Sequence, residues 1–158
     1  MHTLSHLIAF AGDQNTDPIT PAFDKRLGIR EVILLHGSRF SARAGALAKV
    51  VRDAGIGARI LPLPHLHRPE GLEAALAACL SRWREGAIIN LSGASPVVAA
   101  LALRQAERLG LPVCAVEPDT DRLHWISAPP HFASFDVADR ITLAGYLAAH
   151  GLSIVSTE

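Results

Sequence analysis

Short apolar runs, most of them followed by a stretch of helical period, are the feature that most constrains this chain. The apolar runs cover residues 6–12, 31–37, 58–64, 87–93 and 112–118. Two of them contain continuously apolar segments, at 33–35 and 87–89, as expected for parallel strands covered on both faces. The helical stretches cover 41–54, 70–83 and 96–109. This alternation predicts an α/β fold with a Rossmann-like, doubly wound and mostly parallel sheet.

The edges of this sheet are also predictable. Pro62 and Pro64 would interrupt a central hydrogen-bond ladder, which places the third strand at or near an edge. Residues 116–127 contain two strand-like pieces joined through the turn sequence PDTD, and they predict a C-terminal antiparallel hairpin. A last helix is expected over 137–149, after a connecting segment at 128–136.

Composition limits the partners. The 158 residues fit one domain, and 15 basic residues balance 15 acidic ones, so the overall basic excess typical of nucleic-acid binders is missing. A long nucleic acid is therefore not an expected partner, whereas a small anion in a local pocket is compatible. Cys79 and Cys114 lie in apolar stretches and are expected in the core. No run is long enough to span a membrane, and we expect a cytoplasmic protein without a membrane partner.

Ligands of open parallel sheets bind outside the carboxyl ends of the strands. The loops that would lie there cover residues 12–15, 37–40, 65–68 and 92–95. The two standard phosphate motifs, GxxxxGK[ST] and GxGxxG, are missing from the sequence. The loops instead offer hydroxyl and amide groups, which suit a neutral or anionic ligand that carries sugars and bases. Each of these side chains, taken singly, also suits a turn or a helix cap.

Three features of the sequence form a recognisable combination: Asp13-Gln14 after the first strand, the serine-containing turn after the second, and the sequence from Ile89 to Ser127. Together they resemble the CRISPR-associated Rossmann fold (CARF) sensor domains, in the branch often fused to restriction-endonuclease-like nucleases. The fourth loop of that branch typically has the sequence NLTGGTK, where this chain has NLSGASP. Pro96 thus replaces the lysine of the family.

The resemblance implies a homodimer that binds one cyclic oligoadenylate, of four or six adenylates, and controls an attached effector in type III CRISPR antiviral signalling. The ligand-binding candidates that it implies are Asp13, Gln14, Ser38, Arg39, Asn90, Ser92, Gly93, Ala94 and Ser95. Because Pro96 carries no charge, we expect Arg39 to supply the cation for phosphate. No cofactor and no metal is expected. Residues 1–151 would form the sensing domain, and 152–158 a tail or the start of a linker to an effector domain.

Two alternatives remain. Some domains of this type cleave their ring without a metal, and His36 as base with Arg39 as clamp are the catalytic candidates here. A strand-end histidine with a structural hydrogen bond is the plainer interpretation of His36. The other alternative is a small-molecule enzyme on a Rossmann-like domain. His65 and His67 near Glu70 have a spacing that would suit a metal, although a solvated loop is favoured.

Overall fold

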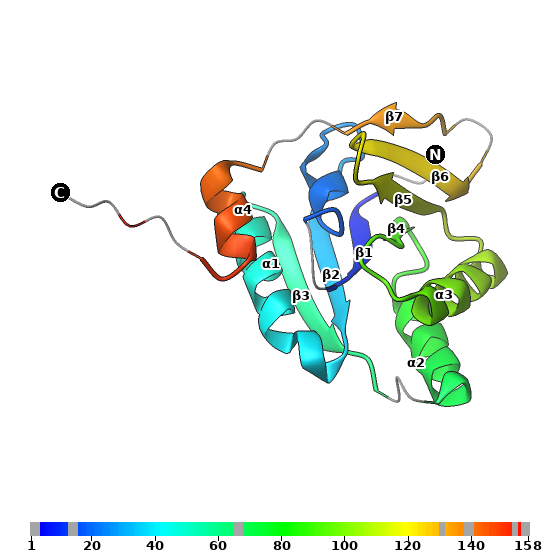
Figure 1. Ribbon diagram of the computed structural model, residues 1–158. Coiled ribbons are helices and arrows are strands. Elements are labelled where there is room, and N and C mark those ends of the chain that lie inside the picture. The colour runs from blue at the N-terminus through cyan, green and yellow to red at the C-terminus, as the bar shows by residue number, and fades with distance from the viewer. Residues whose placement is uncertain are drawn as a thin grey trace.

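The computed structural model describes residues 4–12, 16–64, 68–129, 132–137, 141–152 and 155. Within them, one mixed sheet has the strand order β3-β2-β1-β4-β5-β6-β7 (Figure 1). Its strands are β1 (His6–Phe10), β2 (Glu31–His36), β3 (Gly57–Pro62), β4 (Ala87–Asn90), β5 (Val113–Glu117), β6 (Arg122–Ser127) and β7 (Phe135–Asp136). The first five pair in parallel, and β6 and β7 add antiparallel pairs. The predicted fold class is confirmed, including the edge position of β3.

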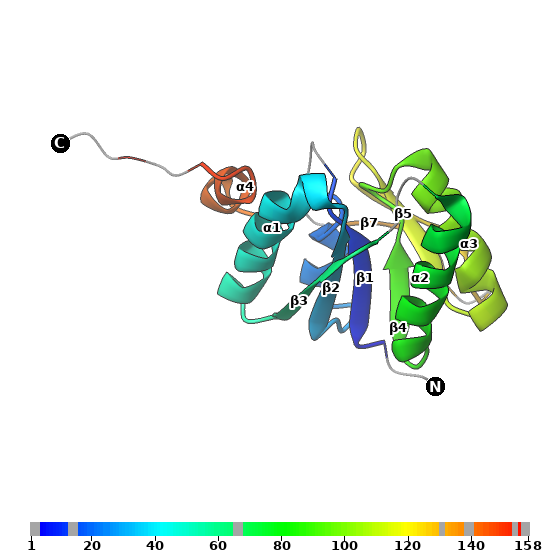
Figure 2. The ribbon, with the colours of Figure 1, turned by 90° about the horizontal axis from the view of Figure 1, so that it is seen from below.

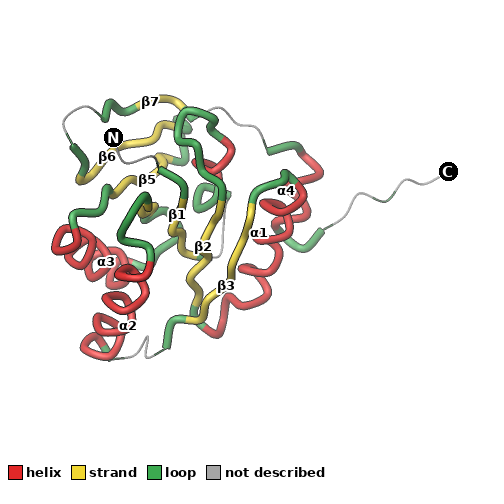
Figure 3. The backbone as a smooth tube through the Cα atoms, turned by 180° about the vertical axis from the view of Figure 1, so that it is seen from behind, coloured by secondary structure: helices red, strands yellow, loops and turns green. Residues whose placement is uncertain are grey.

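Helices cover both faces of the sheet. The helices are α1 (Ser41–Asp53), α2 (Pro69–Arg82), α3 (Pro96–Leu109), α4 (Leu143–Ala149) and the short 3-10 helices η1 (Thr20–Phe23) and η2 (Ser38–Phe40). Figure 2 shows α1 and α4 on one side of the sheet and α2 and α3 on the other. The same arrangement is visible from behind in Figure 3. None of the helices among the described residues is long and apolar enough to cross a membrane.

The central strands are apolar throughout because both of their faces are buried. In β1, Leu7 and Ala9 belong to the core beneath α1, whereas Ile8 and Phe10 belong to the core beneath α2 and α3. The neighbouring strand β2 divides its side chains in the same way, so the sheet separates two apolar layers. Burial on both sides fixes the carboxyl ends of these strands, where the loops of interest begin.

The C-terminal part differs from the sequence prediction. The helix predicted over 137–149 begins only at Leu143, where the Thr142 hydroxyl accepts a hydrogen bond from the N–H of Gly145 at 3.0 Å. The segment predicted as a connection contains β7, which pairs with β6. Its Phe135 packs against the core, and Val137 is buried, with its N–H donating to the carbonyl of Asp121 at 2.8 Å. Burial of these two apolar side chains favours a third antiparallel strand over a helix.

Candidate functional site

Three of the strands that precede the predicted loops end side by side where the strand order reverses. The chain runs outward from β1 through β2 to β3 on one side, and from β4 to β5 on the other. The carboxyl ends of β1 and β4 are therefore neighbours, and the end of β2 lies beside them. This reversal is the place at which open α/β sheets bind ligands.

A pocket of about 220 Å³ lies at this edge. Its apolar wall includes Phe10, Leu35, Phe40, Leu72 and Val98. Its polar part comes from the two glycine-containing loops: His36 and Gly37 follow β2, and the segment 93–95 precedes α3. The candidates Gly93, Ala94 and Ser95 thus line one pocket with His36, as the sequence predicted for a shared edge. The apolar wall was not anticipated, because its members belong to the core pattern of their strands and helices.

The loop after β4 approaches the loop after β1 very closely. A Cβ atom built on Gly12 would lie 2.4 Å from the carbonyl oxygen of Gly93. Gly93 itself has a φ of +82°, a left-handed conformation that favours glycine. Side chains at these two positions would force the loops apart, so glycine at both allows the pocket to form.

Asn90 has a structural role at the end of β4. Its side chain has 0% exposure. The amide nitrogen donates to the carbonyls of Asp17 at 2.8 Å and Pro18 at 3.1 Å, and the amide oxygen accepts from the N–H of Ser92 at 3.0 Å. The polar groups of this side chain are thus bonded within the protein, and the ligand contact implied for Asn90 stays a prediction. Asn90 instead holds the turn against the segment that follows β1.

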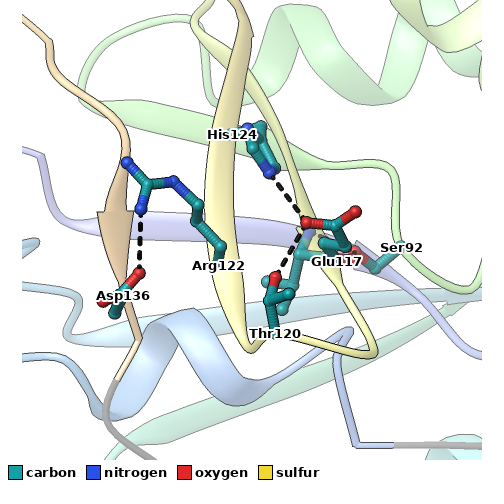
Figure 4. Close-up of polar contacts among 7 residues, drawn as sticks. Ser92, Glu117, Thr120, Arg122, His124 and Asp136 are labelled. Carbon is teal, nitrogen blue, oxygen red and sulfur yellow. Dashed lines mark hydrogen bonds and ion pairs between the residues drawn. The ribbon is translucent and has the colours of Figure 1, made fainter.

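The hydroxyl of Ser92 also makes a hydrogen bond within the protein. Its hydroxyl oxygen accepts a hydrogen bond from the N–H of Val116 at 2.8 Å. This bond ties the turn to β5, beside Glu117 (Figure 4). The expected ligand contact of Ser92 therefore competes with an existing bond, and the hydroxyl acts first as a positioning group.

Ser95 caps α3. Its hydroxyl oxygen accepts from the N–H of Val98 at 3.4 Å, and Pro96 occupies the first helical position. The helix ends at Gly110, in a left-handed conformation, so both predicted ends of α3 are confirmed. Ser95 is exposed, in contrast to Asn90, and it lines the pocket.

Backbone N–H groups along this turn divide into two sets. The N–H groups that donate hydrogen bonds within the protein are those of Leu91, Ser92, Ala94, Val98 and Ala99. Among the described residues, the N–H groups of Gly93, Ser95 and Val97 have no acceptor. These three residues line the pocket at the positive end of the α3 dipole. Three uncommitted donors at a helix N-terminus suit an anionic group.

The loop after β2 contributes the predicted cation. Ser38 and Arg39 are exposed within η2, between the pocket-lining residues Gly37 and Phe40. The Arg39 guanidinium lies 5.6 Å from the centre of the Phe40 ring, and no carboxylate of the described residues pairs with it. His36 is 8% exposed, and its Nδ1 lies 2.9 Å from the carbonyl oxygen of Gly37. His36 therefore makes the structural hydrogen bond expected of a strand-end histidine and also lies at the pocket.

Two ligand-binding candidates, Asp13 and Gln14, lie outside the described residues, as do His65 and His67. Within the described ranges, no group of three His, Cys, Asp or Glu side chains could hold a metal ion. Burial raises the pKa of the Cys114 thiol to about 12 and that of the half-buried Cys79 thiol to about 11. Neither thiol is therefore ionised at neutral pH.

Asp17 is a buried acid that sequence reasoning missed. The residue is 7% exposed, and its Oδ2 atom is buried with no hydrogen-bond partner among the described residues. Burial, and secondly the negative charge of Asp121, raise the pKa of this carboxyl above its usual range. Nothing in the sequence indicates that Asn90 bonds to the carbonyls of Asp17 and Pro18 and so holds this segment against the end of β4.

The hairpin beside the site has its own polar cluster. The Glu117 carboxylate accepts from the Thr120 hydroxyl at 2.8 Å and lies 3.3 Å from Nε2 of His124 (Figure 4). These two contacts lower the pKa of Glu117. Arg122 pairs with Asp136 at 3.2 Å, which joins β6 to β7. The cluster is exposed and stabilises the hairpin rather than lining the pocket.

Comparison with known proteins gives matches in structure alone. No protein-family model matches this chain, and no curated protein does. Protein VC1899 from Vibrio cholerae superposes with a TM-score of 0.81 at 24% identity, over 91% of this chain and 39% of that protein. Can2 from Sulfobacillus thermosulfidooxidans, solved with cyclic tetra-adenylate, gives a TM-score of 0.78 at 18% identity, over 93% of this chain and 41% of Can2.

A third match is a type III CRISPR defence DNA nuclease activated by cyclic oligoadenylate. Its TM-score is 0.66 at 21% identity, over 92% of this chain and 23% of the nuclease. The chain thus spans about two fifths or less of the length of the structures it matches. These likenesses show a shared fold, as the resemblance to CARF domains predicted.

Proposed function

We propose, from the fold that this chain shares with Can2 and the type III CRISPR nuclease, that it binds a cyclic oligoadenylate and acts as a sensor in type III CRISPR signalling. The observation that carries the proposal is the set of uncommitted N–H groups at Gly93, Ser95 and Val97. These three residues line a pocket at the reversal of strand order, which is where this fold class takes its ligands.

The electrostatics of the site suit phosphate. Backbone N–H groups at a helix start attract an anion without requiring a nearby lysine, which offsets the loss of charge at Pro96. Arg39 lies on the neighbouring loop without a carboxylate partner among the described residues. Its guanidinium is therefore available for a bidentate contact with a phosphate oxygen pair.

The symmetry of the ligand supports a homodimer. A ring of four or six identical nucleotides has a two-fold axis, and two copies of one pocket related by the same axis would bind it equivalently. Residues 1–151 would then form the sensing domain, and 152–158 a tail or linker to an effector domain. A cytoplasmic location, expected from the sequence, belongs to the same proposal.

Direct titration tests this function. The purified protein is titrated with cyclic tetra-adenylate and cyclic hexa-adenylate by calorimetry, with linear tetra-adenylate as the control ligand. We expect one of the rings to bind, with one ring for each two chains. Failure of both rings to bind would refute the proposal.

Arg39 provides the sharper test. Arg39→Ala should weaken ring binding by about 10- to 100-fold, because a hydrogen bond to a charged group contributes about 1.5–3 kcal/mol. Arg30→Ala is the matched control, since Arg30 is an exposed arginine that precedes the opposite end of β2. An unchanged dissociation constant for Arg39→Ala would assign the phosphate contact to other groups.

Ring cleavage is the second candidate, favoured by the position of His36 in the same pocket as the free N–H groups. Labelled rings incubated with the protein, without metal, separate the two functions. Intact ring that stays bound supports a sensor. Linear products with a cyclic phosphate end that disappear in His36→Gln support the nuclease.

A further inference from the structure

The pocket at the carboxyl edge is smaller than the proposed ligand. Its volume is about 220 Å³, below the range of about 300–1,000 Å³ that encloses a drug-sized molecule. It therefore takes one part of a cyclic oligoadenylate. Its apolar wall contains Phe10, Phe40 and Leu72, which suit a planar ring, whereas its polar side, with the N–H groups of Gly93, Ser95 and Val97, suits a phosphate. The part of the ligand that fits the apolar wall is a base.

His36 presents a hydrogen-bond acceptor to this pocket. Its Nδ1 lies 2.9 Å from the carbonyl oxygen of Gly37, and because a carbonyl only accepts, Nδ1 carries the proton of this bond. In the neutral ring the other nitrogen, Nε2, is then an acceptor. No described residue makes a hydrogen bond with Nε2, and His36 is one of the residues that line the pocket. The bond to Gly37 thus fixes the tautomer and with it the polarity of the free nitrogen.

Ser95 presents the complementary group. Its hydroxyl oxygen accepts from the N–H of Val98, which leaves the hydroxyl proton to donate. Among the described residues, no acceptor takes this proton, and Ser95 lines the same pocket as His36. The pocket therefore combines the Nε2 acceptor of His36 and the hydroxyl donor of Ser95 with an apolar wall, beside the N–H donors of Gly93, Ser95 and Val97.

We infer that this pocket binds one adenine of the ring and that His36 determines the specificity for adenine, an inference that rests on the proposed function. Adenine offers a 6-amino donor beside a ring-nitrogen acceptor, whereas guanine and hypoxanthine carry a carbonyl acceptor at position 6. Nε2 of His36 accepts from the 6-amino group, and the Ser95 hydroxyl donates to the ring nitrogen. With a carbonyl at position 6, its oxygen and Nε2 of His36 would face each other, and because both are acceptors no hydrogen bond could form.

The free energy lost when two acceptors face each other determines the expected ratio of affinities for adenine and hypoxanthine rings. Leaving a buried polar group without its partner costs about 1–3 kcal/mol, which corresponds to about 5- to 150-fold in affinity. Replacing every adenine of the ring by hypoxanthine keeps the riboses and phosphates and changes only this edge of the base. We therefore expect the ring with hypoxanthine bases to bind about 5- to 150-fold more weakly than the ring with adenine bases.

The experiment compares the two rings on the wild-type protein first. If neither adenine ring binds, the proposed function fails. If an adenine ring binds and its hypoxanthine counterpart binds equally well, the function stands and the role of His36 is refuted. This comparison needs no variant, so it stays decisive even where a substitution prevents folding.

Variants then locate the discrimination. His36→Gln should bring the affinities of the two rings to within about threefold of each other, because its amide can turn either a donor or an acceptor toward the base. His124→Gln, on the exposed face of β6, is the matched control and should keep the wild-type ratio. Arg39→Ala should weaken both rings equally, since it contacts phosphate. A wild-type ratio retained in His36→Gln would overturn the inference.

Discussion

Gly93 and Phe10 meet through their backbones: a Cβ atom on Gly93 would lie 2.6 Å from the carbonyl oxygen of Phe10 and 2.7 Å from Pro18. The loop after β4 thus rests directly on the end of β1 and on the segment that follows it. Because backbone atoms cannot rotate away as a side chain can, this contact fixes the distance between two walls of the candidate site.

Gly93→Ala should therefore destabilise the protein by about 2–4 kcal/mol, as the sum of left-handed strain and overpacking. Gly110→Ala is the matched control, because Gly110 also has a positive φ, of 69°, but a Cβ there would meet nothing within 4 Å. The free energy of unfolding of Gly110→Ala should fall by only about 1 kcal/mol. Urea unfolding of both variants measures the difference. Equal losses would mean that the two loops separate at little cost.

Asn90→Asp tests the buried amide. The variant keeps an oxygen for the N–H of Ser92 but loses the donor to the carbonyls of Asp17 and Pro18, and it buries a charge between acceptors. We expect a loss of about 3 kcal/mol or more at pH 7, reduced at low pH where the new carboxyl is protonated. Denaturant unfolding at pH 7 and pH 4 checks both statements. Wild-type stability at pH 7 would contradict the positioning role.

Ser92→Ala and Ser95→Ala separate positioning from contact. Ser92 has the shorter bond, to the N–H of Val116, and its loss should cost about 1 kcal/mol of stability. The longer cap bond of Ser95 should cost less than about 1 kcal/mol. The effects on ring binding should have the reverse order. Ser95→Ala should lower the affinity for the ring more than Ser92→Ala does, because Ser95 is exposed at the pocket. Calorimetry and thermal unfolding of the same two samples give both orders.

Asp17→Asn should stabilise the protein at neutral pH. Burial raises the pKa of this carboxyl, so the folded state holds its proton to a higher pH than the unfolded chain does. Stability therefore falls as pH rises from the ordinary value of 3.8 through the raised value, and stays lowered above it. The gain from Asp17→Asn should be full at pH 7 and should shrink toward pH 3.

The control for this prediction is Asp119→Asn, on the exposed hairpin turn. Thermal unfolding from pH 3 to pH 8 compares the two variants with the wild type. A stability difference for Asp17→Asn that does not change with pH would show that its effect comes from packing rather than from the carboxyl charge.

The sequence predicted those elements whose signals are local. The ends of α3 followed from Pro96 at its first position and from Gly110 and Pro112 after its last, all of which are local signals. The parallel central strands followed from apolar runs that only burial on two faces explains. In contrast, β7 has two residues, and its pairing with β6 depends on a contact between separate segments of the chain.

The sequence predicted which strand ends would share one edge of the sheet, but not how the side chains there are hydrogen-bonded. The rule for parallel sheets brought the loops after β1, β2 and β4 together correctly. It could not show that Asn90 points into the protein or that the Ser92 hydroxyl bonds to Val116, because both depend on distances between separate segments. Polar side chains in a turn have the same sequence pattern whether they bind a ligand or hold the turn.

The division of N–H groups along the turn before α3 has an entropic consequence. Bonds from Leu91, Ser92, Ala94 and Val98 hold the loop in one conformation before any ligand arrives. Ordering a free backbone residue costs about 1–2 kcal/mol, and a loop that closes on its ligand loses that amount from its affinity. In this protein the turn before α3 loses that conformational entropy when the chain folds, and not when the ligand binds. The donors at Gly93, Ser95 and Val97 form a preorganised cradle, so association should need no slow rearrangement of this loop.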